Sequence, residues 1–112
     1  MRKIAIITAL LLSTTGARAE GAWAVGRGND SCATWLSSPA NEIAGVDYIL
    51  GFWTGLNIAA PTGFHGVGST TDNAGIVGEV RRICRLSPSS SLIVASMSAY
   101  RLIREREFPG TK

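Results

Sequence analysis

In the segment NEIAGVDYILGFWTGLNIAA (Asn41 to Ala60), only Asp47, Thr54 and Asn57 interrupt the apolar sequence after the first two residues. Its length and its lack of period-two alternation favour a helix over a strand. On a helical wheel, the large apolar side chains fall on two sides: Ile43, Val46, Leu50 and Trp53 on one, and Tyr48, Phe52 and Leu56 on the other. Since a helix that is apolar nearly all round must be buried on most sides, we expect a buried central helix in an all-α domain.

Two further helices are predicted on either side of this segment. Asp30 or Ser31 can cap a short helix that runs from Cys32 to Leu36 and is broken by Ser37-Ser38-Pro39. After a Gly-rich loop from Pro61 to Thr71, Thr71 or Asp72 can cap a helix that runs to about Leu86. Its inward side chains would be Ile76, Val80, Ile83 and Cys84, and its outward ones Glu79, Arg81, Arg82 and Arg85.

The last predicted helix begins at Ser87 and Pro88, which match an N-cap and a first helical residue, and runs to about Arg106. Its inward side chains would be Leu92, Ala99, Tyr100 and Ile103. The sequence therefore predicts a small four-helix domain with one short and three longer helices. On the central helix, Ala44, Gly51, Gly55 and Ala59 share a strip where another helix can approach closely.

Residues 1–19 have the organisation of a cleaved secretory signal. Arg2 and Lys3 precede the apolar run from Ile4 to Leu12, and Ala17-Arg18-Ala19 provides the small-x-small cleavage pattern. That run is too short for a transmembrane helix, which needs about 20 apolar residues. We therefore expect a periplasmic or secreted mature domain, residues 20–112, without stable membrane insertion.

Charge gives no indication of a nucleic-acid partner once the signal is removed. The full chain has 11 Lys and Arg against 8 Asp and Glu, but three of the cations, Arg2, Lys3 and Arg18, belong to the signal. The mature domain is therefore close to neutral, and neither nucleic acid nor an anionic membrane is an expected partner.

The two cysteines, Cys32 and Cys84, both lie in the exported part of the chain. In an oxidising compartment such a pair, 52 residues apart, predicts a disulfide. The chain-entropy model gives its closure about 4 kcal/mol of stability, a large contribution for a domain with a small core. A redox pair is disfavoured because there is no Cys-x-x-Cys motif.

No catalytic residues, metal site or cofactor are predicted. The loop Gly63–Ser69 matches neither the Walker pattern nor the dinucleotide fingerprint, so we interpret it as a flexible surface loop. His65 is the only histidine, which is a thin basis for a catalytic triad or a zinc site. We expect it to be exposed to solvent, and we expect a protein that is not an enzyme.

Three sets of residues are candidates for binding or regulation. The aromatic side chains Tyr48, Phe52, Trp53 and Phe64 either belong to the core or form a patch for a protein partner or a second copy. Asp47 is either a pH-sensitive carboxylate near the core or a residue that points outward. The arginines Arg81, Arg82, Arg85, Arg101 and Arg104 are interpreted as the solvated faces of two helices rather than as a binding patch.

The order of three motifs resembles that of small periplasmic proteins of the HdeA/HdeB type. These motifs are Ser31–Leu36 (SCATWL), Gly51–Asn57 (GFWTGLN) and Asp72–Ile76 (DNAGI) leading to Cys84. The resemblance spans Cys32 to about Ile103, and it implies an all-helical fold with the disulfide Cys32–Cys84. It also implies an ATP-independent acid-stress chaperone, in which low pH breaks a homodimer and exposes apolar surface to unfolding clients.

A second resemblance concerns the segment Cys84–Pro88 (CRLSP) and the helix after it, which are similar to immunity proteins that neutralise type VI secretion amidases. The mature chain has a single Lys, Lys112, whereas HdeA-type chaperones are rich in Lys and acidic residues. Acid would still protonate its eight carboxylates and leave a strongly cationic chain. Two hypotheses follow: an acid-responsive periplasmic chaperone, and an envelope protein that binds one specific partner through a surface such as Gly63–Ser69.

Overall fold

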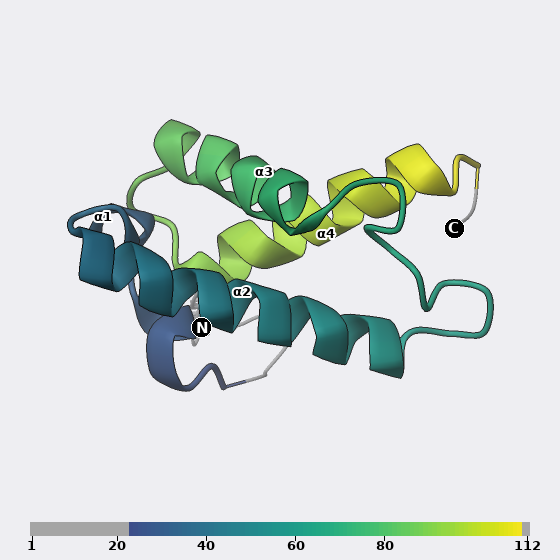
Figure 1. Ribbon diagram of the computed structural model, residues 1–112, viewed down its shortest axis with the longest axis horizontal. Helices are drawn as coiled ribbons and strands as arrows, with labels where there is room; N and C mark the ends of the chain where they lie inside the picture. Colours follow the sequence, from purple (N-terminus) through teal and green to yellow (C-terminus); the bar gives the residue numbers. More distant parts are fainter. Residues whose placement is uncertain (1–22, 111–112) are drawn as a thin grey trace, which may run out of the picture.

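The computed structural model describes residues 23–110, which form a helical bundle without strands in that range. Three long helices, α2 (Pro39–Ala59), α3 (Asn73–Leu86) and α4 (Leu92–Glu107), enclose the core. The short helix α1 (Cys32–Trp35) and the 3-10 turn η1 (Gly26–Asn29) lie near the start of α2 (Figure 1). The predicted all-α fold is confirmed, and the predicted signal, residues 1–19, lies outside the described residues.

Serine and aspartate side chains begin the four α-helices, as the sequence predicts for α1 and α3. The Ser31 hydroxyl accepts a hydrogen bond from the Thr34 N–H at 3.0 Å, and Asp72 Oδ1 accepts one from the Gly75 N–H at 2.8 Å. For α2, Ser38 is the N-cap and Pro39 is the first helical residue. The sequence Ser37-Ser38-Pro39 therefore ends α1 and begins α2 at once, so α2 starts two residues before Asn41.

The predicted start of the last helix at Ser87-Pro88 is wrong, because α4 begins at Leu92 with Ser91 as its N-cap. The carbonyls of this connection serve α1 instead. The Pro88 carbonyl accepts from the Ala33 N–H at 3.0 Å, and the Ser90 carbonyl accepts from the Cys32 N–H at 2.8 Å. These N–H groups belong to the first turn of α1, which has no intrahelical acceptors for them. Tertiary pairing therefore overrides the local helix-start signal.

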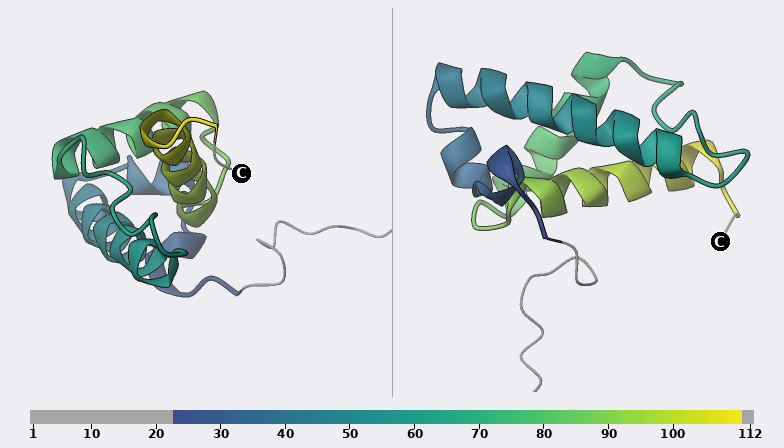
Figure 2. Two further views of the ribbon diagram at one scale, coloured as in Figure 1. Left: turned by 90° about the vertical axis from the view of Figure 1, so that its right-hand side faces the viewer. Right: turned by 90° about the horizontal axis from the view of Figure 1, so that it is seen from below.

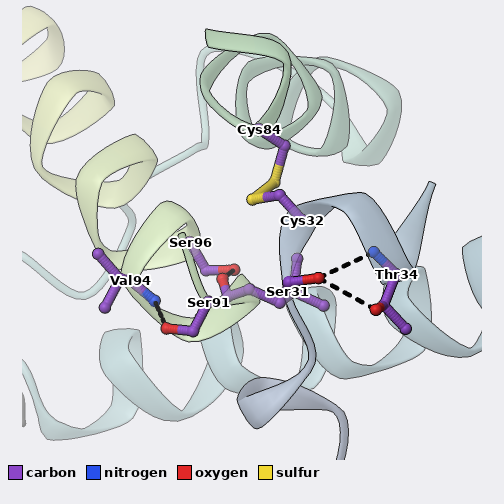
Figure 3. The surroundings of a disulfide bond; sticks show 8 residues. Ser31, Cys32, Thr34, Cys84, Ser91, Val94 and Ser96 are labelled. Carbon is purple, nitrogen blue, oxygen red and sulfur yellow. Dashed lines mark hydrogen bonds between the residues drawn. A yellow bond between two sulfur atoms is a disulfide. The ribbon is translucent and has the colours of Figure 1, made fainter. Parts of the chain in front are cut away.

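The segment before α4 accepts hydrogen bonds from α1, and the start of α4 in turn donates one to the residue before the α1 N-cap. The Leu92 N–H donates to the Asp30 carbonyl at 2.8 Å, so the two N-cap residues Ser31 and Ser91 form an isolated antiparallel bridge. Figure 3 shows both N-caps beside the disulfide that joins Cys32 to Cys84. The start of α1 is thus tied to the start of α4 by hydrogen bonds and to the end of α3 by a covalent bond.

The predicted disulfide is confirmed. The two Sγ atoms of Cys32 and Cys84 are 2.11 Å apart, their Cα atoms are 5.0 Å apart, and both residues are buried. Its position between α1 and the last turns of α3 matches the inward orientation predicted for Cys84. Because α1 has only four residues, this bond anchors an element that is far too short to be stable alone.

The expectation that the segment of α2 is buried on most sides is wrong. Only Gly45, Ile49 and Trp53 of α2 are buried, while Ile43 and Ile58 are 67% and 75% exposed. The largest set of buried side chains belongs instead to α4, namely Leu92, Ala95, Ser96, Ala99, Tyr100 and Ile103. The end-on view shows the reason: α3 and α4 cover one side of α2, and its opposite side faces outward (Figure 2).

The small residues of α2 do not all serve helix contacts as predicted. Gly45 is the one in close contact, because a Cβ atom there would lie 2.2 Å from Cδ1 of Trp35. Gly51 and Gly55 are exposed, and apart from the adjacent residues and the helix's own backbone no heavy atom lies within 4 Å of the position that a Cβ would take. The close approach therefore involves α1 and falls beside the predicted strip, whereas Gly51 and Gly55 face outward.

Candidate functional site

Residues 60–72, here called the α2–α3 loop, project at the end of the bundle where α2 and α4 terminate (Figure 1). The loop folds into successive tight turns: the Phe64 N–H donates to the Pro61 carbonyl at 3.0 Å, and the Ser69 N–H donates to the Gly66 carbonyl at 2.9 Å. Gly68 has φ +97°, and a Cβ there would lie 2.9 Å from Cδ1 of Ile76. The loop therefore has a defined conformation of its own.

The centre of the α2–α3 loop is inserted into the core. Val67 is only 2% exposed, and its carbonyl accepts two hydrogen bonds from α2. One comes from Nε1 of Trp53 at 2.8 Å and the other from Nδ2 of Asn57 at 3.0 Å. Hydrogen bonding of this kind satisfies a loop carbonyl that burial would otherwise penalise. The prediction of a flexible surface loop is therefore wrong for its central part.

Asn57 joins the α2–α3 loop to two helices. Its Oδ1 accepts a hydrogen bond from the Tyr100 hydroxyl on α4 at 2.9 Å, and its backbone carbonyl lies 2.9 Å from Nδ1 of His65. His65 is exposed as predicted, yet its ring is bonded to the end of α2. The Tyr100 phenol is protonated at neutral pH and can donate this bond, and burial raises its pKa further above the ordinary value of 10.0.

Glu107, at the end of α4, holds the other side of the loop. Its Oε1 accepts from the Gly68 N–H at 2.7 Å, and its Oε2 accepts from the Thr70 N–H at 3.0 Å and from the Thr70 hydroxyl. Partial burial favours the neutral carboxyl, but these hydrogen bonds and the nearby Arg106 outweigh it and lower the pKa of Glu107. We call this set of hydrogen bonds the Glu107 latch.

A second carboxylate, Glu79 on α3, lies beside the latch. Its Oε1 is 2.7 Å from a guanidinium nitrogen of Arg82 and 3.8 Å from one of Arg106. The hydrogen bond from Arg82 is the main cause that lowers the pKa of Glu79. Glu79 was predicted to point away from the core, but its side chain is only 16% exposed because it is engaged in these ion pairs.

Three cavities border the α2–α3 loop. The first, of about 360 Å³, lies between residues 66–69 of the loop and α2. The second, of about 450 Å³, lies between Thr70, Thr71 and the carboxylates Glu79 and Glu107. The third, of about 210 Å³, lies between the start of the loop, the end of α2 and α4. The loop end of the bundle is therefore hollowed on several sides, as binding surfaces commonly are.

The aromatic residues predicted as a binding set form three separate pairs. Tyr48 and Phe52 stack with ring centroids 6.0 Å apart, whereas Trp53 is buried against Tyr100. Phe64 packs edge-on against Phe108 with centroids 5.2 Å apart. Of the four predicted residues, Phe64 is thus the one that belongs to the α2–α3 loop.

The remaining candidates are dispersed. Asp47 is exposed on α2, which is the second of its two predicted alternatives. Arg81 pairs with Glu42 at 3.9 Å and lies over the Trp35 ring, so it is not fully solvated. Arg85 and Arg101 are exposed, as predicted. Arg104 is partly buried, and its guanidinium carbon lies 4.5 Å from the centroid of the Phe64 ring.

Asn57 and Glu107 were not predicted from the sequence as functional candidates. Asn57 was visible as an interruption of an apolar helix and as the end of the motif Gly51–Asn57, but neither pattern gave it a role. Glu107 lies in the last turn of α4, where the helix dipole disfavours a carboxylate, and this is the one signal that pointed to a partner elsewhere. Its partners are two main-chain N–H groups and the Thr70 hydroxyl, nearly 40 residues earlier in the chain, which no local side-chain pattern reveals.

Comparison with known proteins yields no match to a family model, to a curated protein or to a solved structure. Within residues 23–110, no cluster of three or more His, Cys, Asp or Glu side chains is placed to hold a metal ion. No helix in that range is long and apolar enough to cross a membrane.

Proposed function

We propose that the chain is an exported, non-enzymatic protein that binds one specific protein partner through the α2–α3 loop and the cavities beside it. The observation that carries this proposal is the double anchoring of the loop. The Val67 carbonyl fixes it to α2, and the Glu107 carboxylate fixes it to α4.

Anchoring supports specific binding because a loop that is already ordered loses less conformational entropy when it meets a partner. The tip remains available for contact, since Thr62, Gly63, His65 and Gly66 are exposed. Rigid scaffolds that present exposed loops are a common arrangement for recognition. An immunity or inhibitor protein of the envelope must recognise one partner, which such a surface allows. The disulfide fits an oxidising compartment.

The test is a quantitative pull-down at neutral pH from periplasmic extract with three forms of the processed protein. Thr62→Arg adds a large charged side chain at the tip of the loop. Ser89→Arg makes the same change at an exposed residue of the α3–α4 connection, at the other end of the bundle (Figure 1). We expect a stoichiometric partner that is retained by wild type and Ser89→Arg and lost by Thr62→Arg. Equal capture by both variants, or no stoichiometric partner at all, would contradict the proposal.

A second candidate function, an acid-responsive chaperone, is favoured by the Glu107 latch. Protonation of Glu107 would remove the charged acceptor that holds Gly68 and Thr70. Release of the loop would uncover apolar side chains beneath it, among them Trp53 and Ile76, which border the cavity next to Val67. Exposed apolar surface is what a chaperone offers to an unfolding client.

Suppression of client aggregation by the oxidised protein, followed from pH 7 to the strongly acidic range, tests this candidate. Glu107→Gln mimics the protonated latch, so it should begin to protect clients at a higher pH than wild type. Glu105→Gln, which removes a carboxylate from an exposed position on the same helix, should not shift the onset. Absence of protection at every pH would refute the chaperone function.

A further inference from the structure

The cavity at the start of the α2–α3 loop differs from its neighbours in that most of its walls are apolar. Leu56 and Ala59 of α2, Pro61 and Phe64 of the loop, and Tyr100 and Arg104 of α4 enclose about 210 Å³. The Tyr100 hydroxyl already donates to Asn57 Oδ1, which leaves the guanidinium of Arg104 as the charged group at this site. There is room for one large apolar side chain.

Within residues 23–110, Arg104 has no carboxylate within ion-pair distance. Four arginines of the described chain, Arg27, Arg81, Arg82 and Arg106, have a carboxylate within ion-pair distance. In residues 23–110 the others are Arg85 and Arg101, which are exposed, and Arg104, which is partly buried. A cation withdrawn from water without a carboxylate favours a negatively charged ligand.

The cavity is formed before any ligand arrives. Phe64 is held from three directions: its N–H donates to the Pro61 carbonyl, its ring packs against Phe108, and the Arg104 guanidinium lies over the ring at 4.5 Å. The π contact fixes the position of the cation while leaving its N–H donors free to form new hydrogen bonds.

We propose that this cavity receives an aromatic or aliphatic side chain of the protein partner, and that a carboxylate next to that side chain pairs with Arg104. The inference rests on the proposed function, and it specifies the chemistry of the partner. The apolar walls supply affinity by burying the side chain. The Arg104 guanidinium, which has no ion-pair partner among the described residues, supplies selectivity, because a neutral neighbour would leave it without one.

Three blocked dipeptides separate the two requirements. Acetyl-Phe-Asp-amide has both groups, acetyl-Phe-Asn-amide lacks the charge, and acetyl-Ala-Asp-amide lacks the large side chain. In an NMR titration of the oxidised protein at pH 7, we expect weak, saturable binding of the first, with shifts centred on Leu56 and Phe64. The affinity of the other two should be lower by about tenfold or more. This is the size of effect expected for the loss of one charge-assisted pair or one buried side chain.

Two variants and one control locate the binding. Arg104→Gln should abolish the preference for Asp over Asn, and Ala59→Leu should fill the cavity and weaken both Phe dipeptides. Arg101→Gln, an exposed change on the same helix, should leave all affinities as they are. Far-UV circular dichroism of each variant verifies its fold. Equal binding of the Asp and Asn dipeptides to wild type, or an unchanged preference in Arg104→Gln, would overturn the proposal.

One further probe and the pull-down distinguish the alternatives. Binding of free 3-phenylpropionate without binding of acetyl-Phe-Asp-amide would overturn the proposal in favour of a small carboxylic acid as ligand. A partner that is lost by Thr62→Arg but retained by Arg104→Gln would overturn the cavity proposal and leave the proposed function standing. Selective dipeptide binding with no partner in the extract would refute the proposed function and support the chemistry assigned to the cavity.

Discussion

Replacement of Glu107 by Gln tests the latch directly. The Gln side chain keeps one acceptor for the Gly68 N–H, but it puts an amide NH2 where Oε2 accepts from the Thr70 N–H. Hydrogen bonds to a charged group contribute about 1.5–3 kcal/mol. Because Thr70 is exposed and water can replace part of this interaction, we expect a loss of about 2 kcal/mol at pH 7. For a domain of this size that lowers Tm by roughly 10 °C.

The effect should depend on pH with a definite sign. The pKa of Glu107 in the folded protein lies below its ordinary value of 4.5, so the charged carboxylate stabilises the fold above that value. This stability is lost as the pH falls through the lower, folded pKa. The deficit of Glu107→Gln should therefore be full at pH 7 and shrink toward zero in acid. The pKa of Glu79 is lowered as well, but Glu79 is present in both proteins and cancels in the comparison.

Urea unfolding followed by far-UV circular dichroism measures this difference over a series from pH 7 to the lowest pH at which both proteins stay folded. Glu105→Gln is the matched control, because Glu105 is exposed and lies two residues away on the same helix. Amide exchange at Gly68 and Thr70 should accelerate in Glu107→Gln alone. Equal stability of the two variants at pH 7, or a deficit that does not shrink in acid, would refute the reasoning.

Three other predictions concern the scaffold. Replacing both Cys32 and Cys84 with Ser should cost about 4 kcal/mol, read from the urea midpoint, and unchanged stability would show that the cross-link contributes nothing. Gly45→Ala should destabilise the fold by about 1–3 kcal/mol because its methyl group would overlap the Trp35 indole ring. Gly51→Ala, on the exposed face of the same helix, should stabilise the fold by up to about 1 kcal/mol. Thermal melts of both variants test this, and two Tm shifts of the same sign would contradict the packing. Ser91→Ala should lose about 1 kcal/mol by removing the N-cap of α4, and an unchanged Tm would argue against that cap.

The helices were predictable where local chemistry decides the structure. Asp72 caps α3 through its own side chain, and the buried positions Ile76, Val80 and Cys84 follow the helical period. The disulfide was predictable from the number of cysteines and the inferred compartment. These features depend on residues close in sequence or on the chemistry of one residue type.

The features that sequence analysis missed depend on main-chain groups far apart in the chain. The Ser87-Pro88 signal was overridden because the carbonyls of Pro88 and Ser90 bind the N–H groups of α1. The glycines of the α2–α3 loop suggested flexibility. However, two of the groups whose hydrogen bonds order the loop, the Val67 carbonyl and the Thr70 N–H, belong to the main chain, and side-chain patterns do not reveal them. Likewise, the composition of α2 predicted burial without indicating how many neighbours are present to cover it.

The pairing of Ser31 with Ser91 affects the order in which the helices form during synthesis. α1 emerges from the ribosome long before Cys84, Pro88 and Ser90, on which its conformation depends. A four-residue helix is not stable before those partner residues have been synthesised. Helix α1, the first α-helix of the described chain, is therefore among the last to form, after nearly the whole chain has been synthesised.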